Sequence, residues 1–224
     1  MPEPSTIAVT AVRLTAARHR AELPLLVLGP SLGASAMTVW SEAAAGLTDA
    51  CDVVAWDLPG HGHNRSEPDR PFTLAELAAG VLDVVDEILL HRDEVGGSFS
   101  YAGLGVGGAV GLQLLLDVPG RVRDAVLIDT DTSAEDATPE GGPVGYDLRE
   151  RLGEITVPVL TVTGAQDVAA LVRTHVLGDP AAEDLSALEA LEDQLRVALD
   201  NGVTVTEIED VLRRLGGAGR GAAE

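Results

Sequence analysis

The sequence predicts an α/β fold in which helices flank a mostly parallel β-sheet. Short apolar runs alternate with longer segments of helical periodicity from residue 7 to residue 162, and this alternation is typical of βαβ units. The chain has 224 residues, of which 46% are hydrophobic. That is enough apolar material for one sizeable core.

The expected strands are apolar or β-branched runs that stop at a Gly, Pro or Asp. They cover residues 7–12, 23–28, 52–56, 98–104, 125–129 and 157–162, and short continuous runs of this kind indicate buried strands. Helical spacing is expected at residues 38–47, 107–117, 147–152, 185–199 and 204–215. A further helix should run from Thr73 to about Leu90, because Thr73 followed by Glu76 forms a capping box.

Two segments are predicted to lie outside this alternation. Residues 130–146 are polar and contain Pro, Gly and acids, which favours a loop or a disordered linker. Leucines at helical spacing between residues 185 and 199 indicate an amphipathic helix. We therefore expect a core over residues 1–170 and a helical tail over residues 171–224.

Composition excludes several classes of partner. Lys and Arg number 15 against 36 Asp and Glu, which gives a net charge of −21. Such a surface repels nucleic acids and anionic membranes. Cys51 is the only cysteine, so no internal disulfide can form, as is common in a reducing compartment. With no recognisable signal peptide and no apolar run long enough to span a bilayer, we expect a cytoplasmic protein.

Sites in parallel sheets form in the loops that follow the strands. Between an expected strand and an expected helix, Gly103-Leu104-Gly105-Val106-Gly107 has the spacing of the Gly-x-Ser-x-Gly turn that exposes a nucleophilic serine. Gly105 stands at the serine position and has no oxygen with which to attack a carbonyl. Gly103, Gly105 and Gly108 also match a dinucleotide-binding fingerprint, with Asp124 or Asp129 as its acid.

Four segments, taken in order, resemble the α/β-hydrolase superfamily and its 3-oxoadipate enol-lactonase branch. They are Leu28–Ser35, Asp57–Gly62, Gly103–Gly111 and Val157–Asp167. The tail segments Val172–Asp179 and Leu195–Gly202 resemble parts of 4-carboxymuconolactone decarboxylase, a domain fused behind the enol-lactonase in some bifunctional chains. The resemblance implies an α/β-hydrolase-like sheet with a reduced lid domain and a shortened decarboxylase-like tail.

The resemblance also shows what this chain lacks. A serine hydrolase needs a nucleophile, a base and an orienting acid. Only Asp167 stands in a matching position, as a candidate acid or base, while Gly105 is a vacant nucleophile position and the segment with the catalytic His is missing. His175 is expected to be an ordinary surface or tail histidine, with a base that folds back as the alternative.

The resemblance implies an oxyanion-binding loop that survives in outline. Backbone N–H groups of Leu32 and Val106 would face negative charge, with Ser31 and Asp129 as polar groups of the pocket. We expect no cofactor and no metal, although His61, His63 and Asp57 could converge on an ion. The family uses the loop His for structure.

The first hypothesis for function is a non-hydrolytic or degenerate member of this branch that binds a small anionic or carbonyl-containing ligand. Its chemistry would be of the lyase, isomerase, cyclase or decarboxylase type. The alternatives are a pseudoenzyme that binds a partner or forms a homo-oligomer, and a lactone or ester hydrolase that uses Ser31 or a water activated by Asp167. An engineered or eroded deletion product without activity stays a further alternative.

Overall fold

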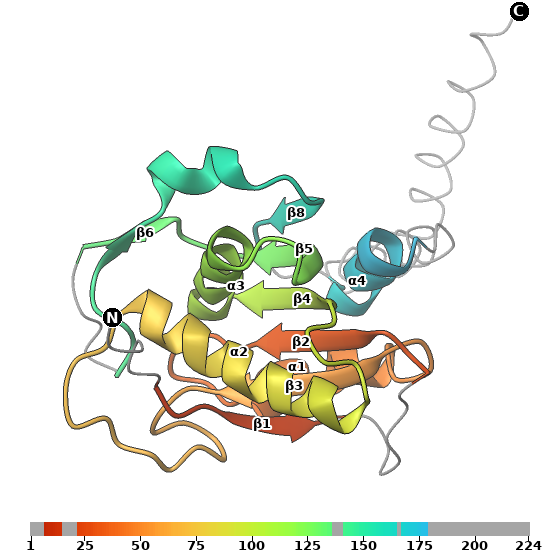
Figure 1. The fold of residues 1–224 in the computed structure, drawn as a ribbon, viewed down its shortest axis with the longest axis horizontal. Coiled ribbons are helices and arrows are strands. Elements are labelled where there is room, and N and C mark those ends of the chain that lie inside the picture. The colour runs from red at the N-terminus through yellow and green to blue at the C-terminus, as the bar shows by residue number, and fades with distance from the viewer. Residues whose placement is uncertain (1–6, 15–21, 136–140, 165–166, 179–224) are drawn as a thin grey trace, which may run out of the picture. The chain divides into compact units, whose positions relative to one another are not determined.

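The computed structural model describes residues 7–14, 22–135, 141–164 and 167–178. Its main element is a six-stranded sheet in the order β1-β3-β2-β4-β5-β8 (Figure 1). Within this sheet only β1 pairs antiparallel with its neighbour, and the other pairs are parallel. The strands are β1 Thr10–Arg13, β2 Leu25–Gly29, β3 Asp52–Asp57, β4 Phe99–Leu104, β5 Val122–Ile128 and β8 Val159–Val162. The predicted α/β class is therefore confirmed.

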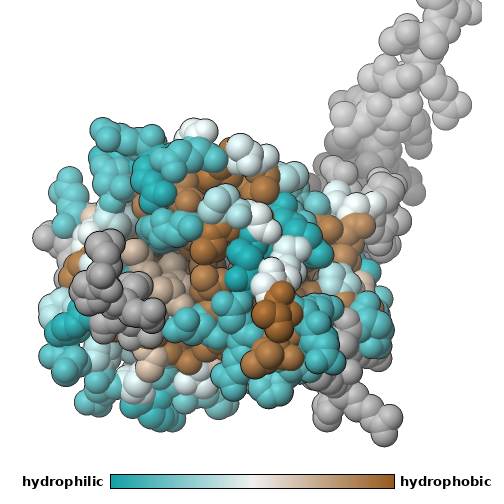
Figure 2. All heavy atoms as spheres, in the orientation of Figure 1, coloured by the Kyte–Doolittle hydropathy of each residue, from teal (hydrophilic) through white to brown (hydrophobic). Residues whose placement is uncertain are grey.

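Helices cover both faces of this sheet. They are α1 Ala36–Ala45, α2 Leu74–His91, α3 Val106–Asp117 and α4 Val168–Leu177. Alternate strand residues enter two separate cores, so Leu25 and Val27 pack with α2 and α3, whereas Leu26 and Leu28 pack with α1 and α4. The strands are buried on both faces, which explains their continuous apolar runs. On the α2 and α3 side, apolar atoms interrupt an otherwise polar surface (Figure 2).

Side-chain caps set the beginnings of three helices. Thr73 and Glu76 form the predicted capping box of α2, which satisfies two backbone N–H groups at once. Ser35 caps α1, so this helix begins two residues earlier than the expected start at residue 38. Asp167 caps α4, since its Oδ1 accepts from the backbone N–H of Ala170 at 2.9 Å.

The segment after β5 is more ordered than expected. The segment over residues 130–146 was predicted to be a loop or a disordered linker. In its described part β6 Ser133–Ala134 pairs antiparallel with β7 Tyr146–Asp147. The Val144 N–H also donates to the Phe72 carbonyl at 2.8 Å. A 3₁₀ helix, η1, follows over Arg149–Glu154, close to the expected helical turns.

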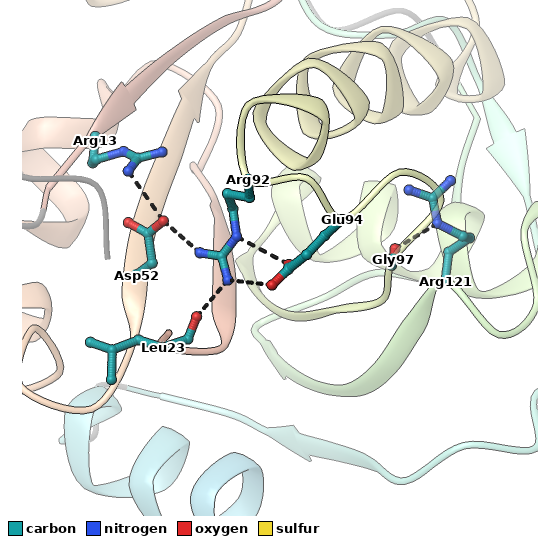
Figure 3. A network of polar contacts seen from close by, with 7 residues as sticks. All are labelled: Arg13, Leu23, Asp52, Arg92, Glu94, Gly97 and Arg121. Carbon is teal, nitrogen blue, oxygen red and sulfur yellow. Dashed lines mark hydrogen bonds and ion pairs between the residues drawn. The ribbon is translucent and has the colours of Figure 1, made fainter. Parts of the chain in front are cut away.

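A buried ion network joins strand ends at the amino edge of the sheet (Figure 3). Asp52 is fully buried and pairs with Arg92 at 2.8 Å and with Arg13 at 3.2 Å. The guanidinium of Arg92 also donates to the Leu23 carbonyl at 2.6 Å and to Glu94 at 3.1 Å. Burial and multiple hydrogen bonds make this network a structural feature of the fold.

The chain divides into two compact units, residues 1–179 and residues 180–224. The second unit lies outside the described residues, and so do the helices predicted over residues 185–199 and 204–215. The core–tail division at residue 170 stays a prediction. Among the described residues, no helix is long and apolar enough to cross a membrane.

Candidate active site

The strand–helix turn predicted from glycine spacing lies between β4 and α3. At its centre, Gly105 adopts φ 55° and ψ −117°. This conformation is unfavourable for a residue with a Cβ atom and accessible to glycine. The backbone of a sharp turn is therefore present, although no side chain projects from it.

The flanking glycines allow α3 to approach the strands closely. A Cβ atom on Gly103 would lie 2.5 Å from the Gly107 carbonyl oxygen, and one on Gly107 would lie 2.4 Å from the carbonyl carbon of Gly29. From below, the buried Tyr101 hydroxyl donates to the Gly107 carbonyl at 2.7 Å. These contacts fix the N-terminus of α3 against the carboxyl ends of β2 and β4.

Ser31 is the described side chain closest to the vacant position. A Cβ atom built on Gly105 would lie 3.5 Å from Ser31 Oγ, and no other described atom outside the turn lies within 4 Å of it. The hydroxyl of Ser31 makes only a 3.5 Å contact with the Leu32 carbonyl, at the outer limit for a hydrogen bond. It is therefore available to a ligand above Gly105.

Two backbone N–H groups next to Ser31 and Gly105 in the chain are candidates for binding the same ligand. The Gly107 N–H donates to the Pro30 carbonyl at 3.0 Å and holds the loop that follows β2 against α3. Within the described part of the chain, no acceptor pairs with the N–H groups of Leu32 and Val106. Val106 is the first residue of the 12-residue α3, whose dipole favours negative charge there. These groups can bind an anion or a polarised carbonyl.

A buried carboxylate braces the loops around this site. Asp57 is fully buried, and its oxygens accept from the backbone N–H groups of Ala36 at 2.6 Å and His63 at 2.8 Å. His61 accepts from the Gly33 N–H at 3.3 Å through Nε2, and its Nδ1 lies 2.8 Å from the Pro59 carbonyl. The tautomer with a proton on Nδ1 satisfies both contacts. His61 thus serves loop structure, as the resemblance implied, and the described residues contain no cluster of three metal-ligating side chains.

The two acidic candidates also have structural contacts. Asp129 is exposed, has a positive φ of 45°, and accepts from the Gly164 N–H at 2.8 Å. Asp167 is exposed and caps α4. No hydrogen bond between described residues joins either carboxylate to Ser31 or to the turn at Gly105. The structure therefore brings Gly105, Ser31 and Val106 together, while the roles of Asp129 and Asp167 in a reaction stay predictions.

The sequence did not reveal a cavity of about 600 Å³ beside the loop that follows β3. Three prolines, Phe72 and Val144 give it apolar walls, and Gly105 is not among its lining residues. His61 lines the cavity and contacts Gly33, so the cavity borders the loop that carries Leu32. Only the cluster Pro68, Pro71 and Phe72 hinted at an unusual loop surface.

His175, expected to be an ordinary surface or tail histidine, is half-buried. This residue lies on α4, and its Nε2 atom is buried without a hydrogen-bond partner. Sequence alone missed it because α4 is positioned by tertiary contacts with β5 and α1. By contrast, His91 lies on the surface at the end of α2. His19 falls outside the described residues.

Several known proteins are similar to parts of this chain. RutD from Pseudomonas savastanoi pv. phaseolicola, named as a carbamate hydrolase, is 30% identical over 111 residues, which are 50% of this chain and 40% of that protein. The chain thus spans about two fifths of that relative's length. A solved hydrolase from Pseudomonas aeruginosa PA01 shares 25% identity with a TM-score of 0.56, over 70% of this chain and 76% of that one.

A third likeness involves the enol-lactonase from Burkholderia xenovorans LB400, at 24% identity and a TM-score of 0.48, over 56% of this chain and 45% of that one. That overlap is too partial to support an argument about substrate. The relatives give no support to a decarboxylase-like tail. The model of the Alpha/beta hydrolase family matches residues 25–216, which is most of the sequence and includes most of the tail. The chain belongs to the alpha/beta hydrolase family.

Proposed function

We propose that this protein binds a small anionic or carbonyl-containing ligand above Gly105 without forming a covalent acyl intermediate. The observation that carries the proposal is the combination at the turn. The sharp turn is present, and the N–H groups of Leu32 and Val106 have no acceptor among the described residues. The nucleophile position is a glycine. A site of this kind stabilises negative charge and offers no attacking oxygen at residue 105.

The electrostatics favour this reading over ordinary ester hydrolysis. Loss of the nucleophile or the base from a serine hydrolase lowers the rate by about a million-fold, and oxyanion stabilisation and binding account for what remains. Backbone donors that face a developing negative charge still assist reactions through an enolate. Lyase, isomerase, cyclase or decarboxylation chemistry therefore suits the site better than acyl transfer.

Within the family, we place the chain in the enol-lactonase branch. The support is the match of Leu28–Ser35 and Asp57–Gly62 to the oxyanion and brace loops of that branch. Asp167 is then the proposed acid or base, and Asp129 a polar group at the edge of the pocket. We further propose a cytoplasmic location, which is supported by the single, buried and unpaired Cys51.

The binding proposal is tested by NMR with levulinate, which carries both a ketone and a carboxylate. Titration should shift the backbone amide signals of Leu32 and Val106 in ¹H–¹⁵N spectra of the native chain. Ser31→Ala should weaken binding by about 5- to 10-fold, since a single hydrogen bond contributes about 1 kcal/mol. Ser41→Ala, at an exposed position of α1, is the matched control and should leave the affinity unchanged. Saturating levulinate without shifts at Leu32 and Val106 would contradict the proposal.

The non-hydrolytic part needs a separate test. The native chain should turn over p-nitrophenyl acetate and enol-lactones only at the background rate of a bulk protein. Gly105→Ser should not restore hydrolysis, because no described base contacts this position. A native rate that a serine-directed fluorophosphonate abolishes would refute the claim.

A second candidate function rests on one contact, the 3.5 Å between Ser31 Oγ and the Cβ position at Gly105. Ser31 Oγ then serves as the nucleophile in place of residue 105. The N–H groups of Leu32 and Val106 would stabilise the negative charge that develops on the substrate's carbonyl oxygen. This alternative predicts that a fluorophosphonate labels Ser31 and that Ser31→Ala abolishes both labelling and ester turnover. Absence of labelling at Ser31 decides for the first proposal.

A further inference from the structure

The loop that joins β3 to α2 (Figure 1) borders a cavity of about 600 Å³. The described lining of this cavity consists of residues 59–61 and 66–72 of the loop and of residues 141, 142 and 144 of a later segment. Ser31 and Gly105 are not among these residues. Small-molecule sites typically have volumes of about 300–1,000 Å³, so this cavity is a candidate site separate from the position above Gly105.

The loop between β3 and α2 is long and irregular, and side-chain hydrogen bonds hold its shape. Residues 58–73 form neither helix nor strand, and irregular loops longer than about 12–15 residues are uncommon and often functional. Asn64 is buried and donates to the carbonyls of Ala8 at 2.9 Å and Asp57 at 3.1 Å. Its side-chain oxygen accepts from the Ser66 N–H at 3.1 Å. The cavity wall is therefore formed before a ligand arrives, which lowers the entropic cost of binding.

The walls of the cavity are apolar and stiff. The lining includes Pro59, Pro68 and Pro71, whose rings fix the backbone φ angle. Phe72 is buried, and its carbonyl accepts from the Val144 N–H at 2.8 Å, which ties the two lining segments together. Walls of this kind accommodate a compact apolar group of a ligand.

The charged side chains of the lining are predominantly acidic. Glu67, Asp69 and Arg70 line the cavity, and all three are exposed. The guanidinium of Arg70 pairs with Glu76 at 2.5 Å and donates to the Pro71 carbonyl at 3.0 Å, so its charge is already compensated. Glu67 and Asp69 make no hydrogen bond or ion pair with a described residue. An anionic ligand would therefore meet two like charges and no unpaired cation among the described lining residues.

The histidine of the lining does not offset these acids. Nε2 of His61 accepts from the Gly33 N–H at 3.3 Å, and Nδ1 lies 2.8 Å from the Pro59 carbonyl. A ring nitrogen that accepts a hydrogen bond carries no proton, so this arrangement holds a neutral imidazole. His61 therefore brings no positive charge to the cavity, and the described lining favours a cation.

We propose that this cavity binds a small organic cation, an ammonium group on a compact apolar body. The positive charge faces the carboxylates of Glu67 and Asp69, and the apolar body packs against Phe72 and the proline rings. The net charge of −21 attracts cations to the whole surface. The preformed apolar walls distinguish this cavity from the other acidic positions, because a solvated acid alone gives an apolar body nothing to pack against.

The experiment compares three probes that share one aromatic ring: benzylamine, which is protonated at neutral pH, benzyl alcohol and benzoate. Each probe is titrated into the native chain at low ionic strength, and ¹H–¹⁵N spectra follow the backbone amides of Gly60, Phe72 and Val144. Benzylamine should shift these signals and bind about 5-fold more tightly than benzyl alcohol, since exposed ion pairs contribute modestly. This advantage should shrink in about 0.5 M NaCl. Benzoate should bind here most weakly of the three.

Matched variants test whether the cavity is responsible. Glu67→Gln combined with Asp69→Asn should abolish the advantage of benzylamine over benzyl alcohol. The control, Glu42→Gln combined with Asp83→Asn, removes two exposed carboxylates from α1 and α2 and should keep that advantage. Val144→Phe adds bulk to the apolar wall and should weaken the binding of both probes.

Three results would overturn the proposal. They are equal affinities of benzylamine and benzyl alcohol for the native chain, an advantage lost equally in the control variant, and affinities that Val144→Phe leaves unchanged. The outcome is independent of the binding proposal for the turn at Gly105, because that proposal is measured with a carboxylate at the amides of Leu32 and Val106. Either site can therefore fail while the other is supported.

Discussion

Replacement of Arg92 by Met tests the buried network at the amino edge of the sheet. Met keeps an apolar stem of similar length and removes the charge that faces Asp52, which is fully buried (Figure 3). Loss of one partner from a buried pair costs about 3–5 kcal/mol, because the other charge stays buried. Arg13 still lies 3.2 Å from Asp52 and is 27% exposed, so we expect the lower end, about 3 kcal/mol.

This loss is large against a typical stability of about 5–15 kcal/mol. For a domain of this size it lowers the melting temperature by about 6–12 °C. Urea unfolding at neutral pH, followed by far-UV circular dichroism, measures the change in the free energy of unfolding. The control is Arg149→Met, whose ion pair with Asp147 is largely exposed; its free energy of unfolding should stay close to that of the native chain.

The double variant Asp52→Asn with Arg92→Met separates charge burial from lost packing. It should be more stable than Arg92→Met alone, because no uncompensated carboxylate is left in the core. If Arg92→Met costs less than about 1 kcal/mol, or if the two substitutions add, the assignment of the network as a buried, coupled pair is wrong.

Three further outcomes follow from single sites. Gly105→Ala should lower the free energy of unfolding by about 1–3 kcal/mol through backbone strain alone. Gly103→Ala should lower it more, because the added Cβ would lie 2.5 Å from the backbone of α3. Urea unfolding of the two variants measures this order. The Arg70 guanidinium and the cap N–H lower the pKa of Glu76 to about 2. The carboxylate therefore stabilises the fold above the usual pKa of a glutamate, and this stabilisation disappears as the pH falls toward 2. The difference in unfolding free energy between the native chain and Glu76→Gln should shrink from pH 6 to pH 2.5. Burial raises the pKa of Asp124, so its charge destabilises the fold once the pH rises through the usual pKa of a carboxyl group. Asp124→Asn should therefore gain melting temperature relative to the native chain between about pH 3 and about pH 7, and a constant difference would contradict this sign.

Features that depend on neighbouring residues were predictable from the sequence. The capping box at Thr73 needs only a residue three positions away, and the turn at Gly105 follows from glycines two positions on either side. The continuous apolar strands indicated a sheet covered on both faces, and two separate cores confirm it. The cap role of Asp167 was not predicted, because no helix was expected over the residues that form α4.

Features that depend on distant contacts were not predictable. The ribbon of β6 and β7 has two residues in each strand, too few for any periodicity to show. The burial of His175 Nε2 depends on how α4 packs against β5, which no local pattern in the sequence shows. Likewise, Ser31 and Gly105 meet only because the loop after β2 is pinned to α3 by the Gly107 N–H.

The backbone conformation at Gly105 is by itself weak evidence for catalysis. Gly103 and Gly107 bring α3 so close to β2 and β4 that the chain must turn sharply between them, whatever residue stands at the centre. Glycine is the residue that meets this demand with the least strain, so packing alone accounts for the φ and ψ at position 105. What packing does not explain is that the Ser31 hydroxyl beside this position, and the N–H groups of Leu32 and Val106 near it in the chain, have no strong partners in the described chain. A ligand at this turn would bind through these donors, and their response to a carboxylate is therefore the decisive measurement.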